Sequence, residues 1–159
     1  YKFVLISANK EALLLTPYFV PMRYLVCYLE QFILRGISVT VLLPEKTDAK
    51  IFDKANIFYM QKYKNLGINF ELVPKMNHAK MLFVDQERVL IGSQNFDFLS
   101  FDLNAEIGMF IKDKKALREL SNIIEGWRKD ARVFDKNKDK LSALDMLISR
   151  ILDFFVALL

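Results

Sequence analysis

Short apolar runs alternate with segments of helical periodicity in the first half of the chain, and this alternation limits the fold more than any other feature. Residues 13–16, 37–43 and 68–73 are apolar or β-branched runs of the kind found in buried strands. Residues 23–34 and 49–65 carry apolar side chains at helical spacing. The order strand, helix, strand, helix, strand predicts an α/β domain.

The second half adds strands that follow one another along the chain. Residues 79–84 and 88–91 predict a β-hairpin, residues 104–111 a further strand, and residues 113–128 a helix capped by its first residue. Residues 46–48 are expected to cap the helix that follows them. Together the two halves predict an α/β fold in which a mixed β-sheet is flanked by helices.

The composition fits one folded domain with an anionic partner. At 159 residues the chain can bury a core of its own, and its formal net charge is +4. That charge suits phospholipid headgroups or nucleic acid and does not choose between them. The single cysteine, Cys27, excludes an internal disulfide and fits a reduced compartment. A chain that starts at Tyr1 is expected to be a fragment or a trimmed form.

A set of polar residues at fixed spacing begins where the hairpin begins. The only histidine, His78, is followed by Lys80, Asp85 and the segment Gly92-Ser93-Gln94-Asn95, which gives the pattern HxKx4Dx6GSxN. A lone histidine in a strand-like segment is more often a core residue than a catalytic one. With the other polar residues and Glu106 in place, a catalytic site is the better interpretation.

These residue types suit attack on a phosphodiester. Its negative charge repels nucleophiles and its leaving alkoxide needs a proton, so a site without metal needs a nitrogen nucleophile, cationic or N–H donors around the phosphate, and an acid. His78 supplies the imidazole, and Lys80, expected on the same strand face, supplies a charge for a phosphate oxygen. Ser93 and Asn95 can complete the phosphate-binding site. Glu106 can hold the imidazole in one tautomer.

The pattern resembles the signature of the phospholipase D superfamily, and a similarity to the second half of bacterial cardiolipin synthases covers most of the chain. It is carried by residues 16–21, 35–39, 42–44, 48, 95–97 and 100–106. The family usually has arginine where this chain has Leu99, and an aromatic residue or leucine where Ala105 stands. The missing guanidinium affects the expected headgroup contacts, whereas every motif residue is present.

The resemblance implies a reaction and a partner. The superfamily pairs two copies of the motif so that two histidines face each other across the phosphorus, and this chain supplies one of them. The expected reaction is phosphatidyl transfer through a phosphohistidine, which forms cardiolipin and glycerol from two phosphatidylglycerol molecules. His78 would act as general acid and base beside a missing N-terminal half, and Asp85 would have a structural and pKa-tuning role. No cofactor is implied, and one histidine far from one cysteine does not predict a metal site.

The chain is expected to divide near its C-terminus. Residues 1–135 would form the catalytic half-domain, and residues 136–159 a charged linker followed by an amphipathic helix. No run reaches the roughly 18 consecutive apolar residues of a membrane span. The helix is expected to pack on the core or on the missing half, and an interfacial membrane helix is the alternative. A phospholipid substrate predicts association with the cytoplasmic membrane.

Two other functions stay open at this point. One is a homodimeric phosphodiesterase or nuclease with one motif per subunit, for which nucleic acid would be a substrate. The other is a non-catalytic half that serves as a scaffold for its partner. The intact motif argues against the scaffold, because loss of His78 or Lys80 would be its mark. A second HxKx4D motif upstream in the full reading frame would indicate the two-motif enzyme.

Overall fold

The computed structural model describes residues 7–97, 100 and 104–156, so Leu99 and the last three residues of the predicted C-terminal helix lie outside it. Within this range seven strands form one sheet in the order β8-β6-β5-β1-β3-β4-β9. The strands are β1 (Glu11–Leu15), β3 (Ser38–Pro44), β4 (Asn69–Val73), β5 (Met81–Val84), β6 (Arg88–Gly92), β8 (Gly108–Ile111) and β9 (Arg132–Val133). β1, β3 and β4 are parallel, and the other strands pair antiparallel with their neighbours. The predicted mixed sheet is confirmed.

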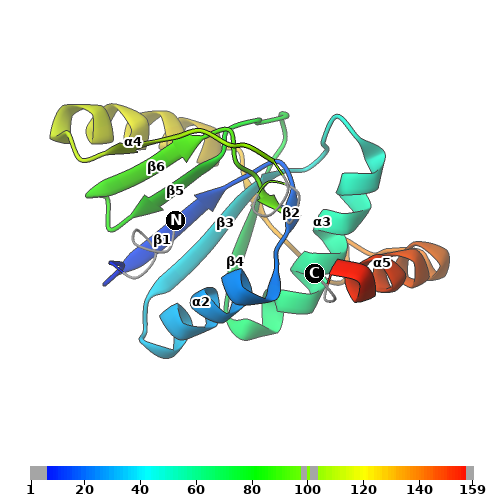
Figure 1. The fold of residues 1–159 in the computed structure, drawn as a ribbon. Coiled ribbons are helices and arrows are strands. Elements are labelled where there is room, and N and C mark those ends of the chain that lie inside the picture. Colours follow the sequence, from blue (N-terminus) through cyan, green and yellow to red (C-terminus); the bar gives the residue numbers. More distant parts are fainter. Residues whose placement is uncertain (1–6, 98–99, 101–103, 157–159) are drawn as a thin grey trace.

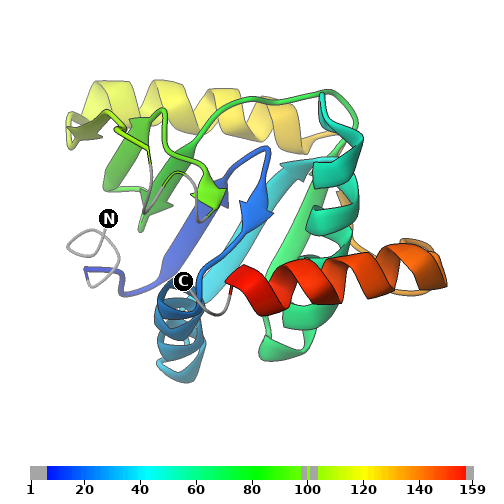
Figure 2. The ribbon, with the colours of Figure 1, turned by 45° about the vertical axis from the view of Figure 1, so that its right-hand side comes forward.

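Helices cover both faces of this sheet. They are α2 (Arg23–Leu34), α3 (Lys50–Tyr63) followed by a short 3₁₀ turn (Lys64–Leu66), α4 (Lys114–Arg128) and α5 (Ala143–Val156). Figure 1 shows α4 on one side of the sheet and α2 with α3 on the other. Figure 2 shows α5 lying across α3, with which it is in contact. A small parallel pair, β2 (Phe19–Val20) with β7 (Phe96–Asp97), forms a second sheet.

Alternation along the strands explains the two apolar faces. Successive strand side chains point to opposite sides of a sheet, so a strand covered on both sides must be apolar throughout. Leu14 and Val41 belong to the core that includes α2 and α3 side chains. Their neighbours Leu15 and Leu42 pack with the buried residues of α4. The continuous apolar runs of the sequence are therefore strands buried on both faces.

The two predicted helix caps have different outcomes. The carboxylate of Asp113 accepts a hydrogen bond from a backbone N–H in the first turn of α4 at 2.9 Å, so this cap is confirmed. Residues 46–48 do not cap α3, because the N-cap position is Ala49, whose own side chain makes no cap hydrogen bond. The Thr47 hydroxyl instead donates to Asp53 at 2.7 Å, which fixes the turn before the helix.

The hairpin is shorter than predicted at the end that bears the motif. β5 begins at Met81, so His78 and Lys80 lie in the loop before it and do not share a strand face. Met81 pairs with Leu15, the last residue of β1. Pro17 follows soon after and has no N–H to donate, so the ladder cannot extend further.

The C-terminal helix α5 is attached to the domain by one face. Asp145 accepts from Lys54, and Asp153 from Lys62 at 2.6 Å, which joins α5 to α3. The opposite face exposes large apolar side chains: Leu144, Leu147, Ile148, Ile151, Leu152 and Phe154. Across the described residues, each helix is too short or too polar to cross a membrane.

Candidate active site

The order of the strands brings the motif residues to one edge of the sheet. β1, β3 and β4 end at this edge, and β5 and β6 are brought to it by the pairs Leu15 with Met81 and Met81 with Ile91. The loops at this edge carry most of the predicted site residues: His78, Lys80, Ser93, Asn95 and Glu106. Open α/β sheets place their sites at the carboxyl ends of the parallel strands.

Lys80 is buried at this edge among acidic groups. Its side chain is 7% exposed, and its ammonium donates to the backbone carbonyl of His78 at 2.8 Å. Burial lowers the pKa of Lys80, while the carboxylates of Glu106, Asp48 and Asp97 act in the opposite direction. These acids therefore favour the charged ammonium, which is the form that holds a phosphate oxygen.

The exposed imidazole of His78 lies against an aromatic side chain. It meets the ring of Tyr18 edge to face, with 6.0 Å between ring centroids and 85° between planes. Tyr18 in turn stacks on Phe52 at 4.2 Å, and its hydroxyl donates to Asp48. Burial, together with Asp48, raises the pKa of Tyr18 to about 12, so the hydroxyl keeps its proton at neutral pH. This arrangement restricts the rotation of the imidazole on one side.

Tyr18, Asp48 and Asp97 belong to the site, although the sequence analysis gave them no chemical role. The buried side-chain amide of Asn56 holds the residues on both sides of Tyr18. It donates to the carbonyl of Pro17 and accepts from the backbone N–H of Phe19, both at 2.8 Å. Tyr18 and Asp48 each follow a predicted buried strand. That position, at the carboxyl end of neighbouring strands, is the signal that could have identified them.

Ser93 and Glu106 bond to each other in the loops after β6 and before β8. The Ser93 hydroxyl donates to the Glu106 carboxylate, and this bond is the main reason that the pKa of Glu106 is lowered. The Ser93 N–H donates to the carbonyl of Ile107 at 2.9 Å. A Cβ on Gly92 would lie 2.2 Å from that carbonyl oxygen, which explains the glycine of the motif. The predicted bond from Glu106 to His78 stays a prediction.

Asn95 and Asp97 follow β6, with Asn95 half-buried and Asp97 buried where its charge acts on Lys80. Asp97 is 3% exposed and accepts from the N–H of Ser100 at 2.8 Å. Burial raises the pKa of Asp97. The side-chain oxygen of Asn95 is buried without a hydrogen-bond partner among the described atoms. Such an acceptor costs about 1–3 kcal/mol when it is left unpaired, so it marks a position where a donor is expected.

Asp85 lies at the opposite edge of the sheet, one strand length away from His78. It follows β5 in the left-handed region, with φ 53°. Its carboxylate accepts from the backbone N–H groups of residues 9–11 at 2.8–3.0 Å. Burial alone would raise the pKa of Asp85, but these hydrogen bonds together lower it. Its observed contacts are structural, and an effect on the site itself stays a prediction.

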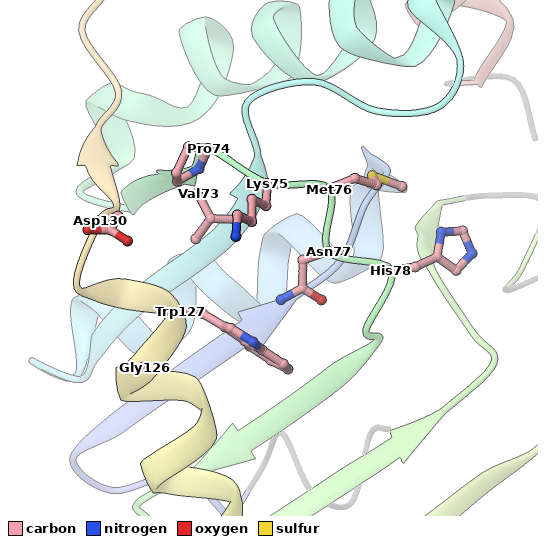
Figure 3. A pocket seen from close by; sticks show the side chains of 9 residues that line it. All are labelled: Val73, Pro74, Lys75, Met76, Asn77, His78, Gly126, Trp127 and Asp130. Atoms are coloured by element: carbon pink, nitrogen blue, oxygen red, sulfur yellow. The ribbon is translucent and has the colours of Figure 1, made fainter.

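A pocket of about 390 Å³ adjoins His78 (Figure 3). One wall is the segment from Val73 to His78, and the other is the end of α4 with Trp127 and the following Asp130. Within the residues that the structure describes, His, Cys, Asp and Glu side chains form no cluster of three that could hold a metal ion.

Similarity to known proteins covers most of this chain. The family model described as cardiolipin synthase, PLD-like domain, matches residues 2–127. The chain belongs to this cardiolipin synthase family. Cardiolipin synthase 2 of Bacillus cereus is 32% identical over 121 residues, which are 76% of this chain and 24% of that protein. The chain therefore spans about a quarter of the length of this relative.

Solved structures share the fold of this cardiolipin synthase family member. Phosphatidylserine synthase of Haemophilus influenzae matches 97% of the chain and 42% of its own, with a TM-score of 0.73 and 16% identity. Nuc of Salmonella typhimurium, a phospholipase D family member, matches 84% of the chain and 88% of its own, with a TM-score of 0.67 and 20% identity. The predicted phospholipase D-like fold is confirmed.

Proposed function

We propose that the chain is the C-terminal half of a two-motif phosphatidyltransferase that forms cardiolipin from two phosphatidylglycerol molecules. The observation that carries this proposal is the meeting of His78, Lys80, Ser93 and Asn95 at one sheet edge in a member of the cardiolipin synthase family. The chain holds one histidine and spans about a quarter of a relative's length, which supports a partner segment with a second motif.

The proposed reaction has two steps in which each histidine has one role. The partner's histidine attacks the phosphorus, a P–N bond forms, and the P–O bond to the first glycerol breaks. The departing alkoxide takes a proton from protonated His78 and leaves as glycerol. The second phosphatidylglycerol then gives its hydroxyl proton to His78, its oxygen attacks the phosphorus, and the P–N bond breaks. Both histidines return to their starting states.

The other site residues would hold the phosphate during these steps. The Lys80 ammonium supplies a positive charge to a non-bridging oxygen, and the Ser93 hydroxyl and the Asn95 amide supply polar contacts. The Glu106 carboxylate, which accepts a hydrogen bond from Ser93, lies near enough to Lys80 to favour the charged form of the ammonium. The side-chain oxygen of Asn95, which has no partner among the described residues, would accept a hydrogen bond from the second half or from a substrate hydroxyl.

A phospholipid substrate requires access to a membrane surface. The exposed apolar face of α5 supports such a location, because apolar helix faces bind at the headgroup boundary. We therefore place the enzyme at the cytoplasmic membrane.

One observation favours a second candidate, a homodimeric phosphodiesterase. The fold match covers 88% of the Nuc chain, so this chain has nearly all of a phospholipase D family member of that size. Two subunits related by a two-fold axis would then bring two His78 side chains together around one phosphate. A nucleic acid substrate would fit the net charge of +4.

Headgroup-labelled phosphatidylglycerol in mixed micelles tests both candidates. The chain is assayed alone and together with the segment that carries the other motif, and released glycerol, cardiolipin and DNA cleavage are measured. The proposed function predicts cardiolipin and glycerol only from the combination. Hydrolysis of a phosphodiester by a dimer of the chain alone would favour the second candidate, and no turnover in either assay would refute both.

A further inference from the structure

The pocket beside His78 combines an aromatic plane with polar groups that are free to bind a ligand. Figure 3 shows the Asn77 side chain extending toward the indole of Trp127, whereas the imidazole of the next residue, His78, points away from both. Both Asn77 and Trp127 are half-buried, whereas Lys75 and Asp130 at the pocket's rim are exposed.

A hydrogen bond fixes the orientation of the Asn77 amide. Its side-chain oxygen accepts from the N–H of Ala79 at 2.9 Å, two residues along the same loop. The amide NH₂ remains as a donor, and Asp130 offers carboxylate acceptors without an ion pair to any described residue. Donor and acceptor therefore line one pocket.

This lining suits a small polyol better than an acyl chain or a second phosphate. Adjacent hydroxyl groups need both donors and acceptors, and the C–H face of a polyol packs on an aromatic ring. An acyl chain would leave the Asn77 amide and the Asp130 carboxylate unpaired. A phosphate would meet Asp130 with only Lys75 to offset it. The volume of about 390 Å³ lies at the lower end for ligand pockets and is large enough for a glycerol headgroup.

We propose that this pocket is the headgroup subsite, which binds the glycerol of phosphatidylglycerol while the phosphate lies at His78 and Lys80. The inference rests on the proposed function, because it assumes that the phosphodiester is held beside His78. Asn77 donates to one glycerol hydroxyl, Asp130 accepts from another, and Trp127 packs against the carbon chain. A lipid whose headgroup lacks hydroxyl groups leaves the polar groups of the pocket unpaired and binds more weakly.

Two water-soluble diesters test the pocket without turnover. Glycerophosphoglycerol carries the headgroup hydroxyls, and dimethyl phosphate has the same charge and no hydroxyl group. Affinity is measured by calorimetry on the full chain, and the emission of Trp127, its only tryptophan, reports on the pocket. The proposal predicts about tenfold tighter binding of glycerophosphoglycerol and a saturable change in emission. Equal affinity for the two diesters would overturn it.

Two variants separate hydroxyl recognition from charge. Asn77→Asp keeps the acceptor for the Ala79 N–H and removes the donor, so the preference for glycerophosphoglycerol should fall about tenfold. Asp130→Ala removes a negative charge, which by charge alone would tighten binding of both diesters. The proposal instead predicts a loss of preference. Glu119→Ala, an exposed acid of α4 outside the pocket, is the matched control and should keep the native preference.

The outcomes also separate this proposal from the proposed function. If the native chain prefers glycerophosphoglycerol and both pocket variants lose the preference, the subsite stands even when no phosphatidyl transfer is observed. If transfer occurs and the variants keep the native preference, the headgroup is bound elsewhere and the subsite is refuted.

Discussion

His78 is the only imidazole of the chain, and it lies at the sheet edge against the ring of Tyr18. Replacing it with alanine removes the proposed acid and base, for which this chain has no substitute. The kcat of phosphatidyl transfer by the two-motif enzyme should fall by more than roughly a thousandfold. The thermal unfolding midpoint should change little, because the side chain is exposed. A variant that keeps a tenth of the activity would contradict the mechanism.

Lys80 offers a test that depends on shape as well as charge. Its buried ammonium donates to the His78 carbonyl and faces three carboxylates. Lys80→Met removes the charge and should reduce kcat more than Lys80→Arg. The arginine variant should still be impaired, because a planar guanidinium does not fit the place of a compact ammonium. Normal turnover by both variants would exclude Lys80 from the phosphate-binding site.

At the scale of elements, Asp85 joins the β5–β6 hairpin to the start of β1. Asp85→Asn keeps the size and tolerates the left-handed backbone, but it weakens three hydrogen bonds to backbone N–H groups. The free energy of unfolding at pH 7 should fall by about 1–2 kcal/mol. Asp113→Asn is a matched control, because asparagine caps a helix as well as aspartate does.

The pH dependence of this loss follows from the lowered pKa of Asp85. Folding favours the charged carboxylate, so its contribution is complete above the unfolded pKa and is lost as the pH falls through the folded pKa. The difference in stability between the native chain and Asp85→Asn should therefore narrow below about pH 4. Denaturant unfolding at several pH values measures it, and a difference that widens in acid would refute this assignment.

Two glycines of the same chain should respond in opposite ways. A Cβ at Gly92 would meet the Ile107 carbonyl at 2.2 Å, so Gly92→Ala should force β6 and β8 apart and destabilise the fold by about 1–3 kcal/mol. A Cβ at Gly126, inside α4, meets nothing within 4 Å. Gly126→Ala should therefore stabilise the chain by about 0.4–1 kcal/mol. Urea unfolding of both variants makes the comparison.

For the whole molecule, the main expectation is that one copy of the motif is not enough for turnover of a phosphodiester. A single histidine cannot attack phosphorus and protonate the leaving oxygen in the same step. The chain as a monomer should be inactive, and its mass by light scattering is measured together with phosphodiesterase activity. The exposed apolar face of α5 is available to the other half, to a second copy or to the membrane. A monomer with ordinary enzymatic turnover would refute both candidate functions.

Local patterns were enough to predict the longer strands and the helices, the mixed sheet and the residues of the motif. Apolar runs and helical periodicity depend on neighbours in sequence, and α2 has the predicted bounds. The motif residues could be identified from their types and spacing, which suit attack on a phosphodiester because it needs a nucleophile, positive charge near the phosphate and an acid for the leaving group. The short strands β2, β7 and β9 were not predicted, because two residues are too few to show a pattern.

Only the tertiary structure decided which of these residues meet. Strand order brings the loops after β1 and β3 beside the motif, so Tyr18 and Asp48 reach the site from distant positions in the sequence. The same hairpin carries Asp85 to the far edge, although it is part of the motif. Spacing along the chain shows which residues form the motif. Burial and hydrogen bonding to other strands determine where each side chain lies in the fold.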